Sequence, residues 1–514
     1  MRILQMQARN FFSFENLDLK LDPGLTVIVG PNGSGKTNLA RLLRMAVDVC
    51  LGNGDPWREA ERRGGKCPVS DDASTVCLSL RLDQKEELVP LGLFVHEVLL
   101  GAIQESYPGR LLELLTKDLT KHQQVLLGPI QESYPGRLLE LLTKDLTKQQ
   151  PTKAVEAALV IRRQVGRWNA EIQLRIDDQW VEWRDRALIL PLDKMARSRL
   201  LQFLCEISSI LAVRDPHMNF HKTADQIHEL LDRSQIEGAV LSYDRLAARD
   251  PWFVQQVRTN LLEPLGIKLE TGRVVSLGEV LGRLLQHGIQ IADNIRLPYW
   301  KTRWGPEAFG RPARAFDIGN GMDLPLYLLR LQHGDPEERR KFEAVRDIFR
   351  ELTGHRFNIR LDAEGQIAIA LEEEFGDVPI EFESAGRWEA LILSAMIAEE
   401  GRVLVLDEPA LNLHPTLQRR ILKRLRERKG QTILITHSPY MVPVEDVEDL
   451  RRIVRFQKEE GATRVYTLGT VEEEQKLLMT LRRSTDMASL LFARGVILTE
   501  GETESGALAA WWGK

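Results

Sequence analysis

A glycine-rich segment near the N-terminus has the residues and the spacing of a phosphate-binding loop. Residues 30–38 read Gly-Pro-Asn-Gly-Ser-Gly-Lys-Thr-Asn and follow an apolar run at 25–29. Glycines let backbone N–H groups turn toward a phosphate, the lysine reaches the β and γ oxygens, and the threonine hydroxyl ligates Mg²⁺. We expect a nucleoside triphosphate to bind here, with Thr37 as a magnesium ligand and with contacts from Asn32, Gly33, Ser34, Gly35, Lys36, Thr37 and Asn38.

Two acids at the end of a second apolar run could supply the matching catalytic chemistry. The run at 403–406 is followed directly by Asp407 and Glu408. Asp407 is suited to hold Mg²⁺ through its water shell, and Glu408 is suited to polarise an attacking water. An apolar run that ends in Asp-Glu is common by itself. The prediction therefore depends on pairing these acids with the loop at 30–38.

Two further positions could contact a nucleotide. His437 ends the apolar run that follows, where a γ-phosphate sensor would lie, although a lone histidine at a strand end is more often structural. Ser384 and Gly386 precede a helix expected at 388–398, and a helix N-terminus directs backbone amides and its dipole toward an anion. A simple helix cap is the alternative for this pair, and these residues alone favour it.

In this order, the four segments resemble the ABC-type ATPases: a Walker A loop, a signature helix, a Walker B strand and an H-loop histidine. The resemblance implies two ATPase heads that enclose two ATP molecules. It also implies that Lys36, Glu408 and His437 are catalytic and that Ser384 and Gly386 contact the nucleotide of the other subunit. The signature departs from LSGGQ at positions 383, 385 and 387.

The spacing between the motifs narrows the resemblance. Lys36 and Asp407 lie 371 residues apart, so a large insertion divides the ATPase domain. The opening Phe-Phe-Ser-Phe-Glu at 11–15 and the segment 407–415 look like the RecF/SMC/OLD branch, which implies no membrane partner. Residues 492–504 are similar to the first strand and turn of a Toprim domain, especially that of OLD-family nucleases.

In that resemblance, Glu500 and Glu504 are metal ligands for phosphodiester cleavage with Mg²⁺ or Mn²⁺. The sequence given stops at Lys514, after one βα unit and before the later acidic pair of a Toprim domain. Two glutamates cannot by themselves fix two metals. We therefore expect an incomplete nuclease site in this stretch.

The elements that must position these groups alternate between strands and helices. The expected fold is α/β, an ABC-type P-loop ATPase with a mixed sheet and an antiparallel β lobe, a large helical insertion and a truncated Toprim βα unit. Residues 98–123 recur almost unchanged at 125–150, which indicates a tandem duplication. The expected units are an N-terminal lobe at 1–95, the duplicated helical insertion at 96–151, antiparallel strands at 152–189, a helical dimerisation region at 190–310, a C-terminal lobe at 311–470 and the incomplete Toprim start at 488–514.

Composition excludes several classes of protein. The chain has 514 residues, 43% of them hydrophobic and 28% charged, which excludes wholesale disorder. A net charge of −5 excludes an overall basic nucleic-acid coat, and no apolar run reaches the ~18 residues of a spanning helix, so we expect a cytoplasmic protein. A basic run at 419–429 could meet DNA, but a solvated helix face explains such runs more often.

These features lead to a first functional hypothesis and two alternatives. The hypothesis is an OLD-family ATPase, as a homodimer or higher homo-oligomer with ATP and Mg²⁺, which controls a Toprim-type endonuclease acting on DNA. Phage defence or DNA processing, with a defence-system partner protein, is the expected setting. The first alternative is a RecF/SMC-like, ATP-switched DNA-binding or repair clamp without nuclease activity. The second is a scaffold with a vestigial ATPase, which the complete pair of Walker motifs disfavours.

Overall fold

The computed structural model describes a set of ranges that covers both expected ATPase lobes. They are 1–53, 74–82, 90–91, 94, 155–164, 167–176, 179–184, 187–189, 235–236, 240–247, 254–255, 257–292, 302–303, 316–361, 365–374, 376–467, 471–483, 488–493 and 511. The duplicated segment at 98–150 lies outside the described residues, as do Glu500 and Glu504. Within these ranges, no helix is both long enough and apolar enough to cross a membrane.

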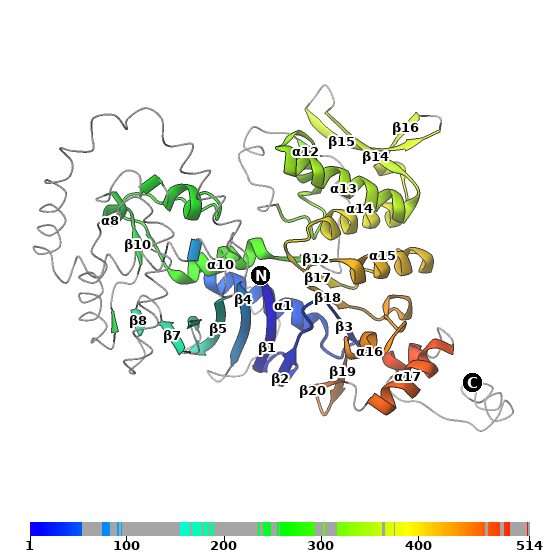
Figure 1. Ribbon diagram of the computed structural model, residues 1–514, viewed down its shortest axis with the longest axis horizontal. Helices are drawn as coiled ribbons and strands as arrows, with labels where there is room; N and C mark the ends of the chain where they lie inside the picture. The colour runs from blue at the N-terminus through cyan, green and yellow to red at the C-terminus, as the bar shows by residue number, and fades with distance from the viewer. Residues whose placement is uncertain are drawn as a thin grey trace, which may run out of the picture.

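A six-stranded sheet forms the centre of the molecule (Figure 1). Its first five strands run parallel, and the last pairs antiparallel at one edge. All five residues of the strand at 25–29 are buried, as parallel strands covered on both faces require. In order across the sheet, the strands are β12 (Ile289–Ala292), β17 (Val403–Asp407), β18 (Thr432–Ile435), β3 (Leu25–Val29), β19 (Ile453–Glu459) and β20 (Ala462–Tyr466).

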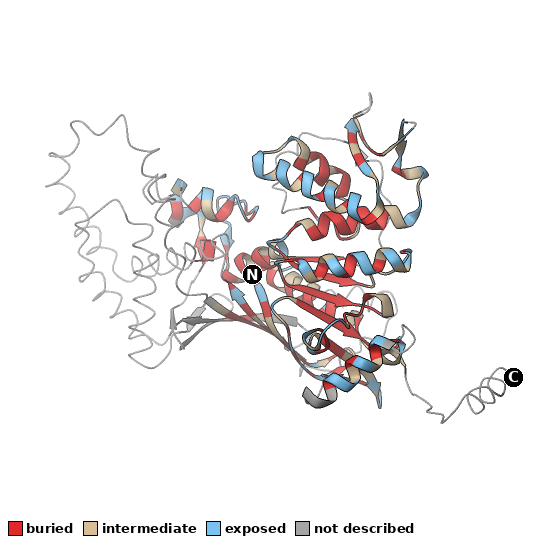
Figure 2. Ribbon diagram, turned by 45° about the vertical axis from the view of Figure 1, so that its right-hand side comes forward, coloured by how far each residue is buried: buried red, intermediate tan, exposed pale blue. Residues whose placement is uncertain are grey.

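The two faces of this sheet belong to two separate hydrophobic cores. Alternate residues of a strand point to opposite faces, so Val27 and Leu406 join one core, whereas Ile28 and Val405 join the other. Figure 2 shows the central strands buried between the layers on either side. The ends of these strands are therefore held from both sides.

The first core lies between the central sheet and a second, antiparallel sheet. Helices α1 (Thr37–Leu51) and α10 (Leu277–Gly288) add apolar residues to this core. Gln431 links the two sheets, because its side chain exchanges hydrogen bonds with the backbone of Ile3 at 2.8 Å and donates to Asp22 O at 2.9 Å. The antiparallel strands, in order, are β2 (Phe14–Lys20), β1 (Arg2–Phe11), β4 (Thr75–Leu82), β5 (Val155–Gln164), β6 (Arg167–Ile176), β7 (Gln179–Arg184), β8 (Ala187–Ile189) and β9 (Gln235–Ile236).

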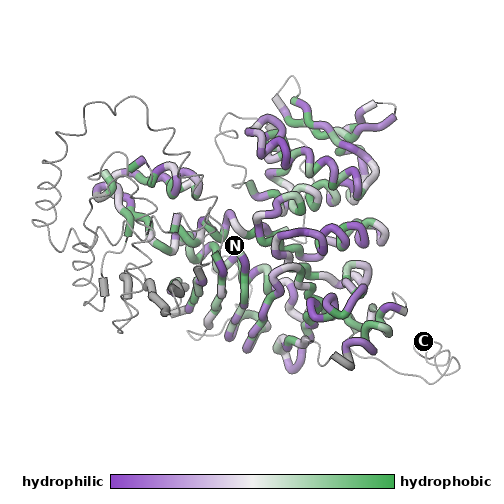
Figure 3. The backbone as a smooth tube through the Cα atoms, in the orientation of Figure 1, coloured by the Kyte–Doolittle hydropathy of each residue, from purple (hydrophilic) through white to green (hydrophobic). Residues whose placement is uncertain are grey.

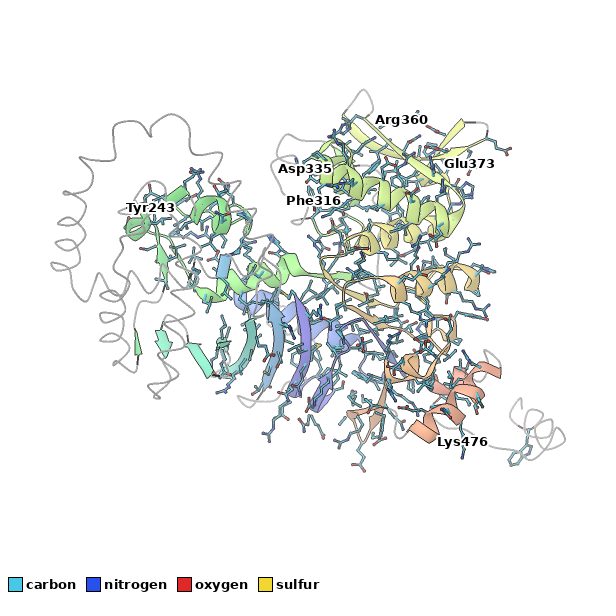
Figure 4. All side chains as sticks on the ribbon, in the orientation of Figure 1. Tyr243, Phe316, Asp335, Arg360, Glu373 and Lys476 are labelled. Carbon is cyan, nitrogen blue, oxygen red and sulfur yellow. The ribbon has the colours of Figure 1, made fainter. Side chains whose placement is uncertain are left out.

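The second core is covered by three helices and a small sheet. The helices are α12 (Leu324–His333), α13 (Pro336–Thr353) and α14 (Ala385–Ala398), and the sheet is built on β14 (Arg356–Leu361) and β15 (Gln366–Glu373). Phe357 packs edge to face on Phe342 and Phe349, at centroid distances of 5.8 and 5.5 Å. Figure 4 labels Asp335, whose carboxylate caps the start of α13 by accepting from Glu337 N and Glu338 N.

The remaining elements lie around these layers. Helix α15 (Pro415–Glu427) connects β17 to β18, and Figure 3 shows long hydrophilic stretches on α13 and α15. The other elements are β10 (Leu241–Ser242), α8 (Tyr243–Ala247), the π-helical turn Arg258–Leu262, β11 (Val274–Val275), β13 (Thr302–Arg303), β16 (Gly376–Pro379), the 3-10 turns Ile380–Phe382, Pro439–Met441 and Ser489–Phe492, α16 (Val447–Arg451) and α17 (Val471–Arg483).

The expected fold class, α/β with a mixed sheet and an antiparallel β lobe, is confirmed, but several elements differ from expectation. The sequence pattern predicts a strand at 379–382, but the strand ends at Pro379 and residues 380–382 form a 3-10 turn. The pattern also predicts one helix over 319–350, but the structure has two, α12 and α13, and the first begins only at Leu324. Gly319 instead lies against β12, where a Cβ would overlap Ile291 O. Strand β12 itself falls inside the range expected to be helical. Strand β12 follows α10 without a turn, so the sequence pattern does not mark where the helix ends and the strand begins.

Candidate active site

Three neighbouring parallel strands end at one edge of the central sheet. Strand β18 lies between β3 and β17, with Ile435 opposite both Ile28 and Asp407. The glycine-rich loop leaves β3, Asp407 and Glu408 end β17, and His437 follows β18. The carboxyl ends of parallel strands in an open α/β sheet are where ligands bind. The topology therefore brings the sequence motifs to one place.

The glycine-rich loop wraps closely around its own lysine. Gly30 has φ +149°, and a Cβ there would overlap the carbonyl oxygen of Phe456, so the position requires glycine. The Lys36 ammonium donates to Gly30 O at 2.9 Å and to Pro31 O at 3.1 Å. Only 6% of Lys36 is exposed. The loop is thus preformed, with a cationic group inside it.

Ser34 supplies evidence that the loop fits a phosphate. The residue is fully buried, and its hydroxyl has no hydrogen-bond partner among the residues that the structure describes. A buried hydroxyl without a partner is costly unless a ligand supplies one. Of the other residues predicted to contact nucleotide, Asn32 and Gly33 are exposed on this loop, and Thr37 begins α1. The loop therefore offers glycine amides, a lysine and a hydroxyl to an anion.

Two residues from outside the motif support the loop from behind. Thr463 Oγ1 lies 2.8 Å from Ser34 O and 2.7 Å from Ser13 Oγ. Thr463 N donates to Ser13 O at 2.7 Å, and Asn38 Nδ2 donates to Ser13 Oγ at 3.0 Å. Asn38, predicted as a nucleotide contact, therefore binds the turn between β1 and β2. A Cβ on Gly35 would overlap the hydroxyls of both supporting residues.

The acids and the histidine form a second group beside the loop. Asp407 is 2% exposed, and Glu408 has a left-handed backbone with φ +51°. Glu408 Oε2 lies 2.6 Å from His437 Nδ1 and accepts from His437 N at 3.1 Å. Burial lowers the pKa of Lys36, and the charges of Glu408 and Asp407 act on it in the opposite direction. Lys36 and the two acids therefore share one electrostatic site.

The donor set suits magnesium carried by a nucleotide. The Thr37 hydroxyl and the Asp407 carboxylate are oxygen donors, which Mg²⁺ prefers. No cluster of three or more His, Cys, Asp or Glu side chains that could hold a metal occurs within the described ranges. Mg²⁺ is commonly bound by one or two carboxylates together with phosphate oxygens. The residues present therefore fit a nucleotide-bound ion better than a metal held by protein alone.

The predicted signature residues lie at the start of α14, beside the loop that follows Glu408. Ser384 is the N-cap of α14, but its exposed side chain makes no capping hydrogen bond. A Cβ on Gly386 would lie 2.7 Å from Asn412 O, so glycine permits this close approach. The structure thus places Ser384 and Gly386 next to the segment that follows the catalytic acids.

Arg387, which stands where the signature has glutamine, is engaged with neighbouring side chains. Its guanidinium lies 2.6 Å from the carboxylate of Glu383 and 3.3 Å from that of Glu373, which Figure 4 labels. It also lies 3.1 Å from His355 Nε2. These contacts connect the start of α14 to the small sheet.

The basic run on α15 is largely occupied by internal contacts. Arg420 donates to the carbonyls of Glu351 and Leu352 at the end of α13, and Arg424 pairs with Glu351. Arg428 is buried, and its guanidinium donates to backbone carbonyls, including Gln431 O at 3.0 Å; burial lowers its pKa to about 10. These three arginines hold α15 in place through internal contacts, which neither the expected solvated helix face nor DNA contact includes.

Sequence motifs identified the loop, the acids and the histidine, but they missed the residues that support them. Ser13 lies in the turn between β1 and β2, and Thr463 lies at the start of β20. Neither belongs to a motif, and they are 450 residues apart. The only sequence signal was the Phe-Phe-Ser-Phe-Glu segment that contains Ser13, which served for family resemblance and not for chemistry.

Two segments of the chain match known protein families. Residues 5–57 match the family described as AAA domain, and residues 385–442 match the family described as AAA domain, putative AbiEii toxin, Type IV TA system. The first segment contains the glycine-rich loop, and the second contains the start of α14, both acids and His437. The two matches therefore cover the two halves of the site.

Several curated relatives match parts of the chain. An uncharacterized protein of Methanocaldococcus jannaschii is 24% identical over 34% of this chain and 22% of its own length. RecF, the DNA replication and repair protein of Corynebacterium jeikeium, is 46% identical over 8% of this chain and 10% of its own length. The OLD nuclease of Thermus scotoductus is 49% identical over 10% of this chain and 9% of its own length. The chain thus matches less than a quarter of the length of each of these relatives.

Among solved structures, an SMC head bound to the C-winged helix domain of ScpA aligns with 92% of this chain and 99% of its own, at 13% identity and a TM-score of 0.41. By these matches, the segments that hold the two halves of the site are similar to AAA domains and to RecF and Smc proteins. An OLD nuclease is among the curated relatives that match, and neither of the two family matches above describes a Toprim domain, so the Toprim assignment stays a prediction.

Proposed function

We propose that this AAA/ABC-type ATPase binds ATP with Mg²⁺ and hydrolyses it, and that hydrolysis controls an action on DNA. The observation that carries the proposal is the meeting of Lys36, Asp407, Glu408 and His437 at adjacent strand ends. A lysine inside a glycine-rich loop, beside two acids, is a set of groups suited to phosphoryl transfer.

Each residue has a distinct role in this proposal. Lys36, already held within the loop, neutralises charge on the β and γ phosphates. Thr37 and Asp407 would hold the magnesium that accompanies the nucleotide, which would supply further positive charge next to the phosphates. Glu408 orients the attacking water and accepts its proton. His437, 2.6 Å from the Glu408 carboxylate, fixes that carboxylate and senses the γ-phosphate.

Two variants test this assignment. Lys36→Ala should abolish ATP binding, because it removes the cation from the loop, whereas Glu408→Gln should keep binding but trap uncleaved ATP. Binding of a fluorescent ATP analogue and single-turnover hydrolysis measure the two effects. Lys20→Ala, at an exposed position on β2, is a matched control that should change neither. Turnover at the unaltered rate in both site variants would remove the assignment.

The signature residues motivate a dimeric head pair. Ser384 and Ala385 are exposed at the start of α14, where amides and the helix dipole favour an anion. We propose that Ser384 and Gly386 contact the nucleotide held by a second copy, and that the segment 190–310 contributes to dimerisation. Analytical ultracentrifugation of Glu408→Gln with ATP should show a dimer that Ser384→Arg weakens. The test deletes only 190–234, because α10 and β12, within 190–310, belong to the described core. If this shortened chain dimerises as before, that part of the segment has no role in dimerisation.

The action on DNA is supported by the curated relatives, which include RecF proteins, Smc proteins and an OLD nuclease. We propose an OLD-type function in which the ATPase governs a Toprim endonuclease with Mg²⁺ or Mn²⁺, in a cytoplasmic phage-defence or DNA-processing system that includes a partner protein. The one OLD nuclease match and the motif around Glu500 and Glu504 support it.

A RecF- or SMC-like DNA clamp is the second candidate. The RecF matches favour it, since they include 31% identity over 18% of the chain to RecF of Erwinia tasmaniensis. A supercoiled-plasmid nicking assay with Mg²⁺ or Mn²⁺ separates the two candidates. Nicking that is lost in Glu500→Ala supports the nuclease, whereas ATP-dependent DNA binding without nicking supports the clamp.

A further inference from the structure

Gln418 is a buried side chain that contacts both segments flanking the proposed catalytic pair. It lies on α15, is 7% exposed and has its whole amide hydrogen-bonded. Its Nε2 donates to Leu413 O at 2.8 Å and to Ala410 O at 3.3 Å, in the loop that follows Glu408. Its Oε1 accepts from the hydroxyl of Ser438 at 2.5 Å, directly after His437. One amide group therefore joins the two segments.

On the histidine side, a short set of hydrogen bonds fixes the turn that Gln418 contacts. Ser438 N donates to Thr436 Oγ1 at 3.0 Å, and Ser438 Oγ accepts from Tyr440 N at 3.3 Å. Thr436 is fully buried, so the backbone on both sides of His437 is held. The distance between His437 Nδ1 and Glu408 Oε2, 2.6 Å, depends on this backbone.

On the other side, the loop that Gln418 contacts reaches the start of α14. Between its two carbonyl acceptors lies Asn412, which has a left-handed backbone with φ +61°, and Asn412 O lies against Gly386. A displacement of α14 would therefore move the carbonyls that Gln418 holds. Because the amide is rigid and buried, that displacement reaches Ser438 and His437 through it.

We propose that Gln418 is a positioning residue that sets the geometry of Glu408 and His437 and couples it to the position of α14. This inference rests on the proposed ATPase function and deepens it. Gln418 touches neither nucleotide nor metal in this role. It acts on the hydrolysis step, because it holds the group that orients the water, and it leaves nucleotide binding in the glycine-rich loop unchanged.

Gln418→Met tests the inference, because methionine keeps the length of the side chain and removes its three hydrogen bonds. We expect kcat for ATP to fall roughly 10- to 100-fold, the cost of misplacing a catalytic group by about 1 Å. The dissociation constant of a fluorescent ATP analogue should stay within about twofold of that of the unaltered protein, since Lys36 is untouched. A kcat that also stays within about twofold would overturn the proposal.

Gln431→Met is the matched control. Gln431 is 3% exposed and also makes three hydrogen bonds, but to Ile3 and Asp22, between the two sheets. The Gln431→Met variant should lower the melting temperature as much as Gln418→Met does, but it should leave kcat unchanged. An equal loss of kcat in both variants would mean that Gln418 is merely structural.

A second variant covers the case in which Gln418→Met does not fold. Ser438→Ala removes the hydrogen bond to Gln418 together with the one that Ser438 Oγ accepts from Tyr440 N. Its kcat should fall while ATP affinity holds, and an unchanged kcat would count against the proposal. Failure of the underlying function looks different. In that case Glu408→Gln would turn over ATP at the rate of the unaltered protein, whatever the Gln418 variants do.

Discussion

Replacing Thr463 by valine should weaken ATP binding, although Thr463 lies in no nucleotide-binding motif. Valine has the shape of threonine without its hydroxyl, so packing at this 1% exposed position is kept. The change removes the donor that lies 2.8 Å from Ser34 O in the glycine-rich loop. It also removes the partner of Ser13 Oγ at 2.7 Å. The support behind the loop is thus lost without a change in volume.

The size of the effect follows from the hydrogen bonds. A hydroxyl carries a single hydrogen, so if Thr463 donates to Ser34 O, Ser13 must donate to Thr463 Oγ1. Leaving a buried acceptor without its donor costs about 1–3 kcal/mol. If the loop conformation that binds phosphate bears that whole cost, the dissociation constant rises by roughly 5- to 150-fold. Thr463→Ser keeps the hydroxyl and should bind nearly as well as the unaltered protein.

Titration with a fluorescent ATP analogue in Mg²⁺ measures the change in affinity. Thr480→Val is the control, because the Thr480 hydroxyl donates to Lys476 O in an exposed hydrogen bond within α17. The double variant with Ser13→Ala should lose less than the sum of the two single changes, since both act through one hydrogen-bonded chain. A dissociation constant for Thr463→Val within twofold of the unaltered value would refute the idea that β20 supports the loop.

Further expectations follow from other contacts. Arg428→Met leaves the carbonyl of Gln431 without its buried donor and should lower the melting temperature by several degrees in differential scanning fluorimetry, whereas Lys429→Met should not. Arg420→Ala with Arg424→Ala should lower stability without changing DNA affinity in a filter-binding assay, because both side chains already bind the end of α13; a large loss of DNA affinity alone would contradict this. Cys50, whose pKa burial raises to about 12, should resist iodoacetamide at pH 8 until the protein unfolds, as peptide mass mapping would show.

The sequence predicted the parts of the site whose functional residues are consecutive in the chain. The loop at 30–38 and the acids at 407–408 each follow an apolar run, so local pattern placed both at strand ends. The sequence pattern also predicts a helix at 414–429, close to the observed span of α15, Pro415–Glu427, because proline at the first helical position marks its start.

The parts that were not predicted depend on contacts between distant residues. From sequence alone, the basic run at 419–429 is interpreted as a solvated helix face, because its acidic partners, such as Glu351 and Glu445, lie elsewhere in the chain. Strand β12 has only four residues, and its identity comes from pairing with β17 rather than from its own periodicity. Gln418 has no local signal, since a glutamine on a helix is ordinarily solvated. Strand pairing and the burial of a side-chain amide are set by tertiary contacts, so they become visible only in the folded structure.

The alternation of Val27 and Ile28 toward two different cores has a genetic consequence. The candidate site lies at the strand ends of the central sheet, and separate hydrophobic cores pack on the two faces of that sheet. A packing defect among the helices on one side should therefore be compensated by substitutions among residues on the far side that share no contact with it. Selections for restored growth should return such remote suppressors from both halves of the molecule.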